Sequence, residues 1–415
     1  MTKKDLYDLG EVPPLGYVPK RMHAATIRPE RYGEPIQAYE FEVLDVPPIG
    51  PRQVLVHIMA AGVNYNGVWT SFAKPVDMIA ARKKRGEKED FHVGGSEGSG
   101  VVWAVGSDVT SVKVGDPVMV SPVRWDEHSD DIRMGVDPVA STTARVWGYE
   151  DNYGCFAQFS VVEDFQCFRK PKNLTFETAA CVIVSFATAY RQLRGWHPHV
   201  VRPGDPILIW GGAGGLGTAA IQITREFGGI PIAVVSSAEK AEFCKRLGAR
   251  GTINRRDFDH WGRLPEIGTP AFDRWSAGVR SFGKAFWEAL GERRNPYIVF
   301  EHSGQDTLPT SIFVCDNRGM VVTCGGTSGY NCDVDVRVLW MRQKRFQGSH
   351  FASTREVAEA IHMLGSGRLD PCHARTYPFQ EVGEAHQLMY ENQHPPGNLA
   401  LLVNAPREGL KELPV

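Results

Sequence analysis

Residues 206–217 read Pro-Ile-Leu-Ile-Trp-Gly-Gly-Ala-Gly-Gly-Leu-Gly, an apolar segment that runs directly into a cluster of glycines. The spacing G-x-G-x-x-G within it permits a tight turn, close approach of the backbone to a pyrophosphate, and close packing of the following helix. The three glycines with this spacing are Gly212, Gly214 and Gly217. A helical pattern begins at 218–223, and a second apolar segment follows at 230–235. This stretch therefore predicts a strand, a phosphate-binding turn and a helix, which together begin a dinucleotide-binding domain.

The segment after the second predicted strand indicates which nicotinamide cofactor binds. NAD enzymes usually place Asp or Glu about 20 residues beyond the glycines, where it accepts a hydrogen bond from the ribose 2′-hydroxyl. This chain has Ser236-Ser237-Ala238-Glu239-Lys240 there, and two hydroxyls with an ammonium suit the 2′-phosphate of NADPH. Alternatively, Ser236 caps the next helix, Lys240 is a surface charge, and Glu239 is a displaced acidic residue. The predicted NADPH-binding residues are Gly212, Ala213, Gly214, Gly215, Leu216, Gly217, Ser236, Ser237 and Lys240.

Length and composition describe an ordinary globular chain. Single cores stop growing near about 250–300 residues, so a chain of 415 residues predicts two domains. The 46 basic and 48 acidic side chains give a net charge of −2, which favours neither nucleic acid nor an anionic membrane as a partner. The sequence contains no apolar run typical of a signal peptide or membrane span, and its eight cysteines lack C-x-x-C spacing. We expect a cytoplasmic protein with reduced thiols.

Two patterns divide the chain. Short strands separated by glycine turns, at 93–102 and 114–118, are typical of a small β-barrel, and 147–159 also has strand character. Residues 174–195 have helical periodicity. From Arg202 onward, strands and helices alternate as in a doubly wound parallel sheet. Its later elements are expected as strands at 297–300, 319–326 and 346–350, a helix at 355–367 and a closing strand at 399–403.

The segment 255–296 is a long, aromatic and basic stretch between two predicted strands. A connection of a few residues and one helix would suffice there. We interpret it as a helical insert with two open roles. It is an oligomer contact with a solvated charged face, or its basic side chains also contact an anionic substrate.

The order of a β-barrel lobe, a glycine-turn nucleotide domain and a return to the first lobe resembles the medium-chain dehydrogenase/reductase superfamily. Longer stretches resemble its crotonyl-CoA carboxylase/reductase family, and the resemblance covers nearly the whole chain. These stretches are A-A-G-V-N-Y-N-G-V-W at 60–69, R-V-W-G-Y-E at 145–150, A-T-A-Y-R at 187–191, V-F-E-H at 299–302, W-M-R-Q-K-R at 340–345, Q-G-S-H-F-A at 347–352 and N-Q-H-P-P-G-N at 392–398.

The resemblance implies an α/β fold with two domains. A GroES-like β-barrel catalytic domain is expected over 1–196 and 356–415, and a Rossmann-type doubly wound parallel sheet that binds NADPH over 197–355. The implied reaction transfers a hydride from NADPH to Cβ of a 2-enoyl-CoA thioester, and the resulting enolate attacks CO₂ at Cα to give an alkylmalonyl-CoA. The family also implies a homodimer or homotetramer, with 255–296 as a candidate contact.

The chain departs from the zinc alcohol dehydrogenases of the superfamily. Those enzymes carry Cys in the turn occupied here by Asn64, and His before the Glu at the position of Ser96-Glu97. No Cys lies between Met1 and Gly154, so the four-cysteine structural zinc lobe is also missing from the sequence. Because a catalytic zinc needs about three protein ligands, we predict a reductase without metal.

By resemblance, polar side chains from three stretches form the CO₂ site. Asn66 is the preferred amide donor and Asn64 is expected beside the nicotinamide, although the choice between the two asparagines stays open. His350 and Glu150 complete the site, with the backbone of Tyr149 beside them. The alternatives are that His350 only caps a strand end and that Glu150 is a solvated barrel carboxylate.

Acyl selectivity is expected from the helix at 179–186. Val182, Ile183, Val184 and Phe186 are apolar where the family is often more polar and Thr-rich. This predicts activity on enoyl chains longer than crotonyl. The same residues are equally explained as an ordinary helix core.

Three other functions share parts of this pattern. A plain enoyl-CoA reductase would release the saturated acyl-CoA, and a quinone reductase would ignore CoA thioesters. An NADPH-binding structural protein would bind cofactor without turnover. Asn66, Glu150 and His350 together argue against the structural protein.

Overall fold

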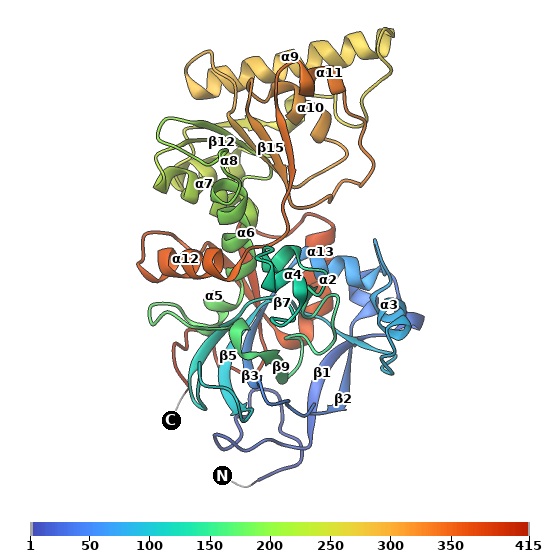
Figure 1. Cartoon of the computed structure of the whole chain (residues 1–415), viewed down its shortest axis with the longest axis vertical. Helices are drawn as coiled ribbons and strands as arrows, with labels where there is room; N and C mark the ends of the chain where they lie inside the picture. Colours follow the sequence, from blue (N-terminus) through green and yellow to red (C-terminus); the bar gives the residue numbers. More distant parts are fainter. Residues whose placement is uncertain (1–2, 414–415) are drawn as a thin grey trace. The chain divides into compact units, whose positions relative to one another are not determined.

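The computed structural model describes residues 3–413, so residues 1–2 and 414–415 of the predicted GroES-like domain lie outside it. The chain divides into two compact units (Figure 1). The first unit runs up to Val184 and resumes at Ile361, and the second is Ser185–Ala360. The division falls within helix α6 (Ile183–Arg194).

The first unit is built around strand β3 (Gln53–Gly62), which is buried from Val54 onward. β3 pairs antiparallel with β5 (Gly98–Val105), β9 (Phe159–Glu163) and β18 (Asn398–Leu402). The sheet continues through β6 (Pro117–Val120) and β10 (Cys167–Arg169) on one side and β17 (His373–Pro378) on the other. A smaller sheet has the order β2 (Glu40–Asp45), β1 (Arg21–Ile27) and β4 (His92–Val93). This is the predicted GroES-like arrangement, in which the last strand of the chain returns to the N-terminal lobe.

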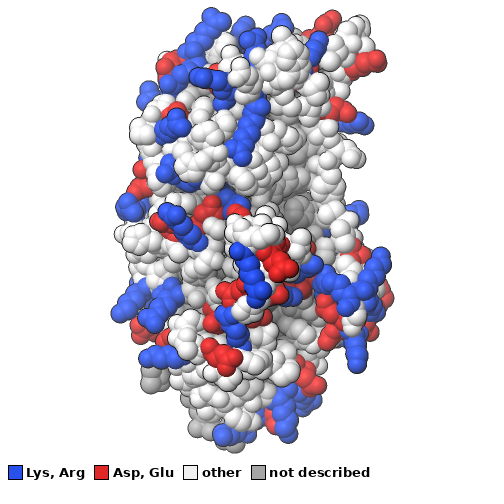
Figure 2. Space-filling view, in the orientation of Figure 1, with Lys and Arg blue, Asp and Glu red and all other residues white. Residues whose placement is uncertain are grey.

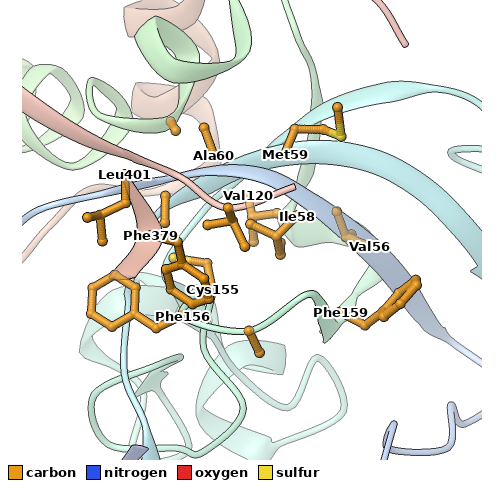
Figure 3. Packing of buried hydrophobic residues seen from close by; sticks show 14 of the residues in the cluster. Val56, Ile58, Met59, Ala60, Val120, Cys155, Phe156, Phe159, Phe379 and Leu401 are labelled. Atoms are coloured by element: carbon orange, nitrogen blue, oxygen red, sulfur yellow. The ribbon is translucent and has the colours of Figure 1, made fainter. Parts of the chain in front are cut away.

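Residues far apart in the sequence form the core of this unit. Ile58 of β3, Val120 of β6 and Leu401 of β18 are fully buried, and Phe156 and Phe379 each retain 1% exposure (Figure 3). Burial of such side chains contributes about 1.5–3 kcal/mol each. The C-terminal segment is therefore a necessary part of the barrel core.

Two local predictions in this unit are wrong. Residues 147–156 form turns, bends and irregular structure, Ala157 makes only an isolated bridge to Ala24, and a regular strand begins at Phe159. The chain turns because Gly148 and Tyr153 have φ of 67° and 56°, which an extended strand does not allow. The helical segment 174–195 is broken into α5 (Phe176–Ala180) and α6, because Cys181 leaves the helical conformation with φ −116° and ψ 14°.

The second unit contains a parallel sheet, which in the described chain has the strand order β13-β12-β11-β14-β15-β16. The strands are β11 (Pro206–Ile209), β12 (Ile230–Val235), β13 (Gly251–Asn254), β14 (Ile298–Glu301), β15 (Met320–Thr323) and β16 (Arg345–Gly348). Helices α7 (Gly215–Glu226) and α8 (Ala238–Arg246) connect the first three strands. The order reverses between β11 and β14, where doubly wound sheets bind their ligands. The predicted doubly wound sheet is confirmed.

The predicted insert contains one long helix, α9 (Pro270–Leu290), which covers a face of this sheet. Val279, Phe282 and Phe286 are completely buried and pack with Trp210 and Val234 from the strands. Their spacing of three and four residues places them on one side of the helix. The apolar side of the insert is therefore part of the core of the second unit.

The charge distribution agrees with the composition. Figure 2 shows Lys and Arg interspersed with Asp and Glu over the visible face. Among residues 3–413, no helix is both long and apolar enough to cross a membrane.

Candidate active site

The glycine turn links β11 to α7 and is sterically closed at two of its three motif positions. A Cβ at Gly212 would lie 2.6 Å from the Cβ of Ala233, and one at Gly217 would lie 2.7 Å from the Cα of Gly212. At Gly214, a Cβ would meet only the carbonyl oxygen of Gly211, at 3.5 Å. The first and third glycines thus close the turn, and the middle glycine leaves room for a ligand.

Helix α7 begins at this turn, with Gly214 as its N-cap. The first amides of a helix have no preceding carbonyl with which to pair, and the helix dipole places positive charge there. The amides of Gly215, Leu216 and Gly217 occupy these positions. Since Gly214 has no side chain that would cover them, this end of α7 fits the pyrophosphate of a dinucleotide.

The segment after β12 differs from the sequence-based alternative in its capping residue. The hydroxyl of Ser237, rather than that of Ser236, caps α8 by accepting a hydrogen bond from the N–H of Lys240 at 3.2 Å. Lys240 is half-buried, and desolvation followed by repulsion from Arg255 and Arg256 lowers the pKa of its ammonium. Like charges held near one another favour binding of an anion.

Arg255 and Arg256 were missed as site residues because they were counted with the predicted insert. They lie in a 3-10 turn (Arg255–Asp257) directly after β13, and β13 pairs with β12. Adjacent parallel strands end at the same edge of a sheet. The position of Arg255 and Arg256 directly after a strand is the sequence feature that could have predicted them near Lys240.

A buried acidic residue supports the start of the glycine turn. Glu301, at the end of β14, accepts hydrogen bonds from the N–H groups of His302 at 2.9 Å and Ser303 at 2.7 Å, and from the hydroxyl of Ser311 at 2.7 Å. The imidazole Nε2 of His302 lies 3.2 Å from the carbonyl oxygen of Trp210. The V-F-E-H stretch therefore braces the residue that precedes the glycines.

The two candidate asparagines of the first unit are each oriented by a residue distant in sequence. Asn64 donates from Nδ2 to Oε1 of Glu97 at 2.8 Å, and Asn66 lies with Nδ2 3.4 Å from the hydroxyl of Ser96. Both asparagines are half-buried at the start of α2 (Tyr65–Ser71). Ser96 and Glu97 were not predicted as site residues, since neither lies near the asparagines in the chain.

Glu97 is almost completely buried, with 1% exposure. Its second carboxylate oxygen accepts the N–H of Val184 at 2.8 Å. Desolvation raises the pKa of Glu97 to about 7, and the hydrogen bonds from Val184 and Asn64 oppose that rise. The carboxylate thus links the asparagine turn to the end of the predicted acyl segment.

Glu150 belongs to a turn that folds back on itself. Its carboxylate accepts the N–H of Val146 at 2.8 Å, and its carbonyl oxygen accepts from the guanidinium of Arg85 at 2.9 Å. Arg85 also pairs with Glu87 at 3.1 Å. Glu150 and Tyr149 are both half-buried, so these contacts hold the turn in a defined conformation.

His350 lies in the second unit, two residues beyond the end of β16, with its side chain exposed. The preceding residue, Ser349, donates its N–H to the carbonyl of Thr323 at 2.8 Å. This places His350 at the carboxyl edge of the parallel sheet, which is also the edge at which the glycine turn lies. Asn64, Asn66, Tyr149 and Glu150 belong to the first unit.

The apolar acyl-segment residues are mostly interior. Val182, Ile183 and Phe186 are at most 1% exposed, and Val184 is half-buried. Among residues 3–413, no group of three His, Cys, Asp or Glu side chains is arranged to share a metal ion.

A barrel unit completed by the C-terminal strand, and a doubly wound sheet with a phosphate-binding turn, define a medium-chain dehydrogenase/reductase. Residues 50–172 match the family described as alcohol dehydrogenase GroES-like domain, and residues 215–366 match the one described as zinc-binding dehydrogenase. The chain belongs to the crotonyl-CoA carboxylase/reductase family. It is 48% identical over 409 residues to the crotonyl-CoA carboxylase/reductase of Cereibacter sphaeroides, covering 99% of this chain and 94% of that protein.

Solved structures agree with this assignment. The crotonyl-CoA carboxylase/reductase AntE in complex with NADP has a TM-score of 0.95 and 61% identity, covering 98% of this chain and 100% of that one. The 2-octenoyl-CoA carboxylase reductase CinF in complex with NADP and 2-octenoyl-CoA has a TM-score of 0.87 and 35% identity, covering 95% and 90%. The family and the fold class predicted from the sequence are confirmed.

Proposed function

We propose that the protein catalyses the NADPH-dependent reductive carboxylation of a 2-enoyl-CoA thioester to an alkylmalonyl-CoA. The observation that carries this proposal is the pair of oriented asparagines, Asn64 and Asn66, in a fold whose other unit has a phosphate-binding turn. The membership in the crotonyl-CoA carboxylase/reductase family supports it.

NADPH, when bound, supplies the hydride that reduces Cβ of the substrate. The amides of Gly215, Leu216 and Gly217 bind its pyrophosphate, with Gly212, Ala213 and Gly214 shaping the turn. The hydroxyls of Ser236 and Ser237 and the cations of Lys240, Arg255 and Arg256 bind its 2′-phosphate. Charge-assisted hydrogen bonds of this kind are roughly twice as strong as neutral ones, which favours NADPH over NADH.

Asn66, Glu150 and His350, with the Tyr149 backbone, bind CO₂ in this proposal, and Asn64 is directed to the nicotinamide and thioester. The oxygens of CO₂ are weak acceptors, so an ordered amide donor is the side-chain group that suits them. The enolate must react with CO₂ before it is protonated. Exclusion of water therefore decides between the carboxylated and the saturated product.

The acyl segment sets the chain length of the substrate in this proposal. Val184 is the half-buried member of the segment, and Val182, Ile183 and Phe186 form the apolar wall behind it. A solved 2-octenoyl-CoA carboxylase reductase, 35% identical, agrees with a substrate longer than crotonyl-CoA, whereas the more similar AntE and Cereibacter sphaeroides proteins are named for crotonyl-CoA. Equal or better turnover of crotonyl-CoA across a chain-length series would contradict this part.

We also propose a homodimer or homotetramer, with the edge of the second unit's sheet as a contact between copies. Apolar side chains are exposed on α11 (Val336–Trp340), at its C-cap residue Met341 and on edge strand β16: Val336 is 63% exposed, Trp340 67%, Met341 60% and Phe346 44%. An edge strand has unpaired backbone groups that a symmetry-related copy can pair with. The apolar side of α9 in segment 255–296 is already covered within the unit.

The cytoplasmic location remains part of the proposal, supported by the free thiols of all eight cysteines.

One assay distinguishes the candidate functions. NADPH oxidation is followed with crotonyl-CoA and a longer enoyl-CoA in labelled bicarbonate with carbonic anhydrase, and the acyl product is identified by mass spectrometry. We expect labelled alkylmalonyl-CoA. Unlabelled saturated acyl-CoA alone identifies a plain reductase, and NADPH binding without turnover identifies a structural protein.

Two variants test the site residues in the same assay. His350→Asn and Glu150→Ala are expected to lose carboxylation and keep reduction. If both variants carboxylate as well as the wild type, the assignment of the CO₂ site is wrong.

A further inference from the structure

The sequence Ser96-Glu97 lies behind the asparagine turn, in the connection between β4 and β5. Both residues are buried, with exposures of 2% and 1%. A Cβ at Gly62 would lie 2.6 Å from both Cγ and Oε1 of Glu97. Gly62, at the end of β3, therefore has no room for a side chain, because the side chain of Glu97 occupies that space.

Each oxygen of the Glu97 carboxylate accepts a hydrogen bond from an N–H donor. Oε1 accepts from Nδ2 of Asn64 and Oε2 from the N–H of Val184, both at 2.8 Å. No Lys, Arg or His among residues 3–413 forms an ion pair with it. A buried carboxylate without a cation is costly, so an apolar side chain would serve a purely structural purpose at least as well.

Asn64 is the N-cap residue of α2, but its side chain is not directed to the helix amides. An N-cap hydrogen bond typically contributes about 0.5–2 kcal/mol. Asn64 forgoes that contribution and donates to Glu97 instead. Since Nδ2 points at Glu97, the carbonyl oxygen and the second N–H of the amide are directed elsewhere.

We propose that Glu97 is a positioning residue that fixes which end of the Asn64 amide faces the nicotinamide and the thioester. The enolate is thereby held in the orientation in which it reacts with CO₂ rather than with a proton. Ser96 does the same, more weakly, for Asn66, since their contact is 3.4 Å long. This inference rests on the proposed function, because the partition between the two products exists only in a carboxylating enzyme.

The test is the product partition of Glu97→Gln at saturating CO₂, NADPH and enoyl-CoA. This substitution keeps the shape but replaces one acceptor oxygen with an NH₂ donor, so the new side chain cannot accept from both Asn64 and Val184. We expect the ratio of saturated to carboxylated acyl-CoA to rise about tenfold, as for loss of one hydrogen bond to a charged group. The dissociation constant for NADPH should stay within twofold of the wild type.

Glu177→Gln is the matched control. Glu177 is also buried, with 4% exposure, and accepts the N–H of Gly409 at 2.7 Å, but it forms no hydrogen bond with Asn64 or Asn66. Its substitution should leave the partition unchanged, and Ser96→Ala should change it less than threefold.

The outcomes are separable. If the wild type releases only saturated acyl-CoA, the proposed function fails and this inference with it. If the wild type carboxylates and folded Glu97→Gln has the same partition, only the role of Glu97 is overturned. Should circular dichroism show that Glu97→Gln does not fold, Glu97→Asp is the second variant. Its side chain is one methylene group shorter, which withdraws the carboxylate from Asn64 and Val184, so a wild-type partition in that variant overturns the inference.

Discussion

The glycine turn and the asparagine turn both follow a buried strand, but they depend on different ranges of sequence. The glycine turn closes against its own backbone and against β12, which is the next strand in the chain. The asparagines are oriented by residues 33 and 30 positions away, and Glu97 in turn contacts Val184 across 87 positions. A requirement of the backbone leaves a local motif in the sequence, whereas the orientation of a side chain by distant partners does not.

Gly217→Val should have the largest effect, because it tests the closed side of the glycine turn. The added side chain would meet backbone atoms at 2.7 Å, which cannot move as a flexible side chain would. We expect NADPH affinity to fall about 100-fold or more, the equivalent of about 3 kcal/mol of overpacking. A fluorescence titration measures the affinity, and a thermal melt detects loss of the fold. Wild-type affinity would show that the turn is not the binding site.

The pH dependence of the free energy of unfolding tests the environment of Glu97, the distant residue that orients Asn64. The pKa of Glu97 is raised to about 7 in the folded protein, above its ordinary value of 4.5, so the folded state holds this proton more tightly than the unfolded state. Stability from this group is present below pH 4.5 and is lost as the pH rises to 7, by about 3 kcal/mol in total.

Thermal melts of the wild type and Glu97→Gln at pH 5 to 7.5 measure this loss. The variant cannot titrate at this position, so it serves as the control. We expect the wild type to lose stability relative to the variant as the pH rises, and parallel curves would contradict the shift.

The cation cluster tests a contact of intermediate range, between the ends of β12 and β13. Lys240→Ala and Arg255→Ala each remove one charge from the proposed 2′-phosphate site. We expect NADPH affinity to fall about 10- to 100-fold, since a hydrogen bond to a charged group contributes about 1.5–3 kcal/mol. NADH affinity should stay the same, and Lys245→Ala, on the same helix with its ammonium paired to Glu242, is a control that should change neither. An equal loss for both cofactors would place the cluster outside the 2′-phosphate site.

Gly214→Ala should have the smallest effect and tests the open side of the glycine turn. Its Cβ meets only one protein atom, at 3.5 Å, so the melting temperature should equal that of the wild type. The methyl group would point toward the pyrophosphate, and we expect NADPH affinity to fall about tenfold. If Gly214→Ala destabilises the protein as much as Gly217→Val, the two sides of the turn do not differ as described.

The sequence predicted most of the parallel sheet, because buried parallel strands are continuous apolar runs next to glycine turns. The strand prediction failed at 147–156, where positive φ angles at Gly148 and Tyr153 turn the segment away from the extended form. The sequence also predicted one helix where the structure has α5 and α6, since a periodic pattern does not show the break at Cys181. Each failure lies where contacts with distant residues override a local preference.

By itself, the sequence determined the doubly wound sheet, the glycine turn and the expectation of NADPH, because each depends on a backbone requirement or an apolar period in neighbouring residues. The family followed from the resemblance of longer stretches of the chain. The tertiary structure alone decided that Ser96 and Glu97 orient Asn66 and Asn64. The physical reason is that charge and hydrogen bonding act between atoms a few ångströms apart in space. No local pattern in the chain reports which distant side chain will be there.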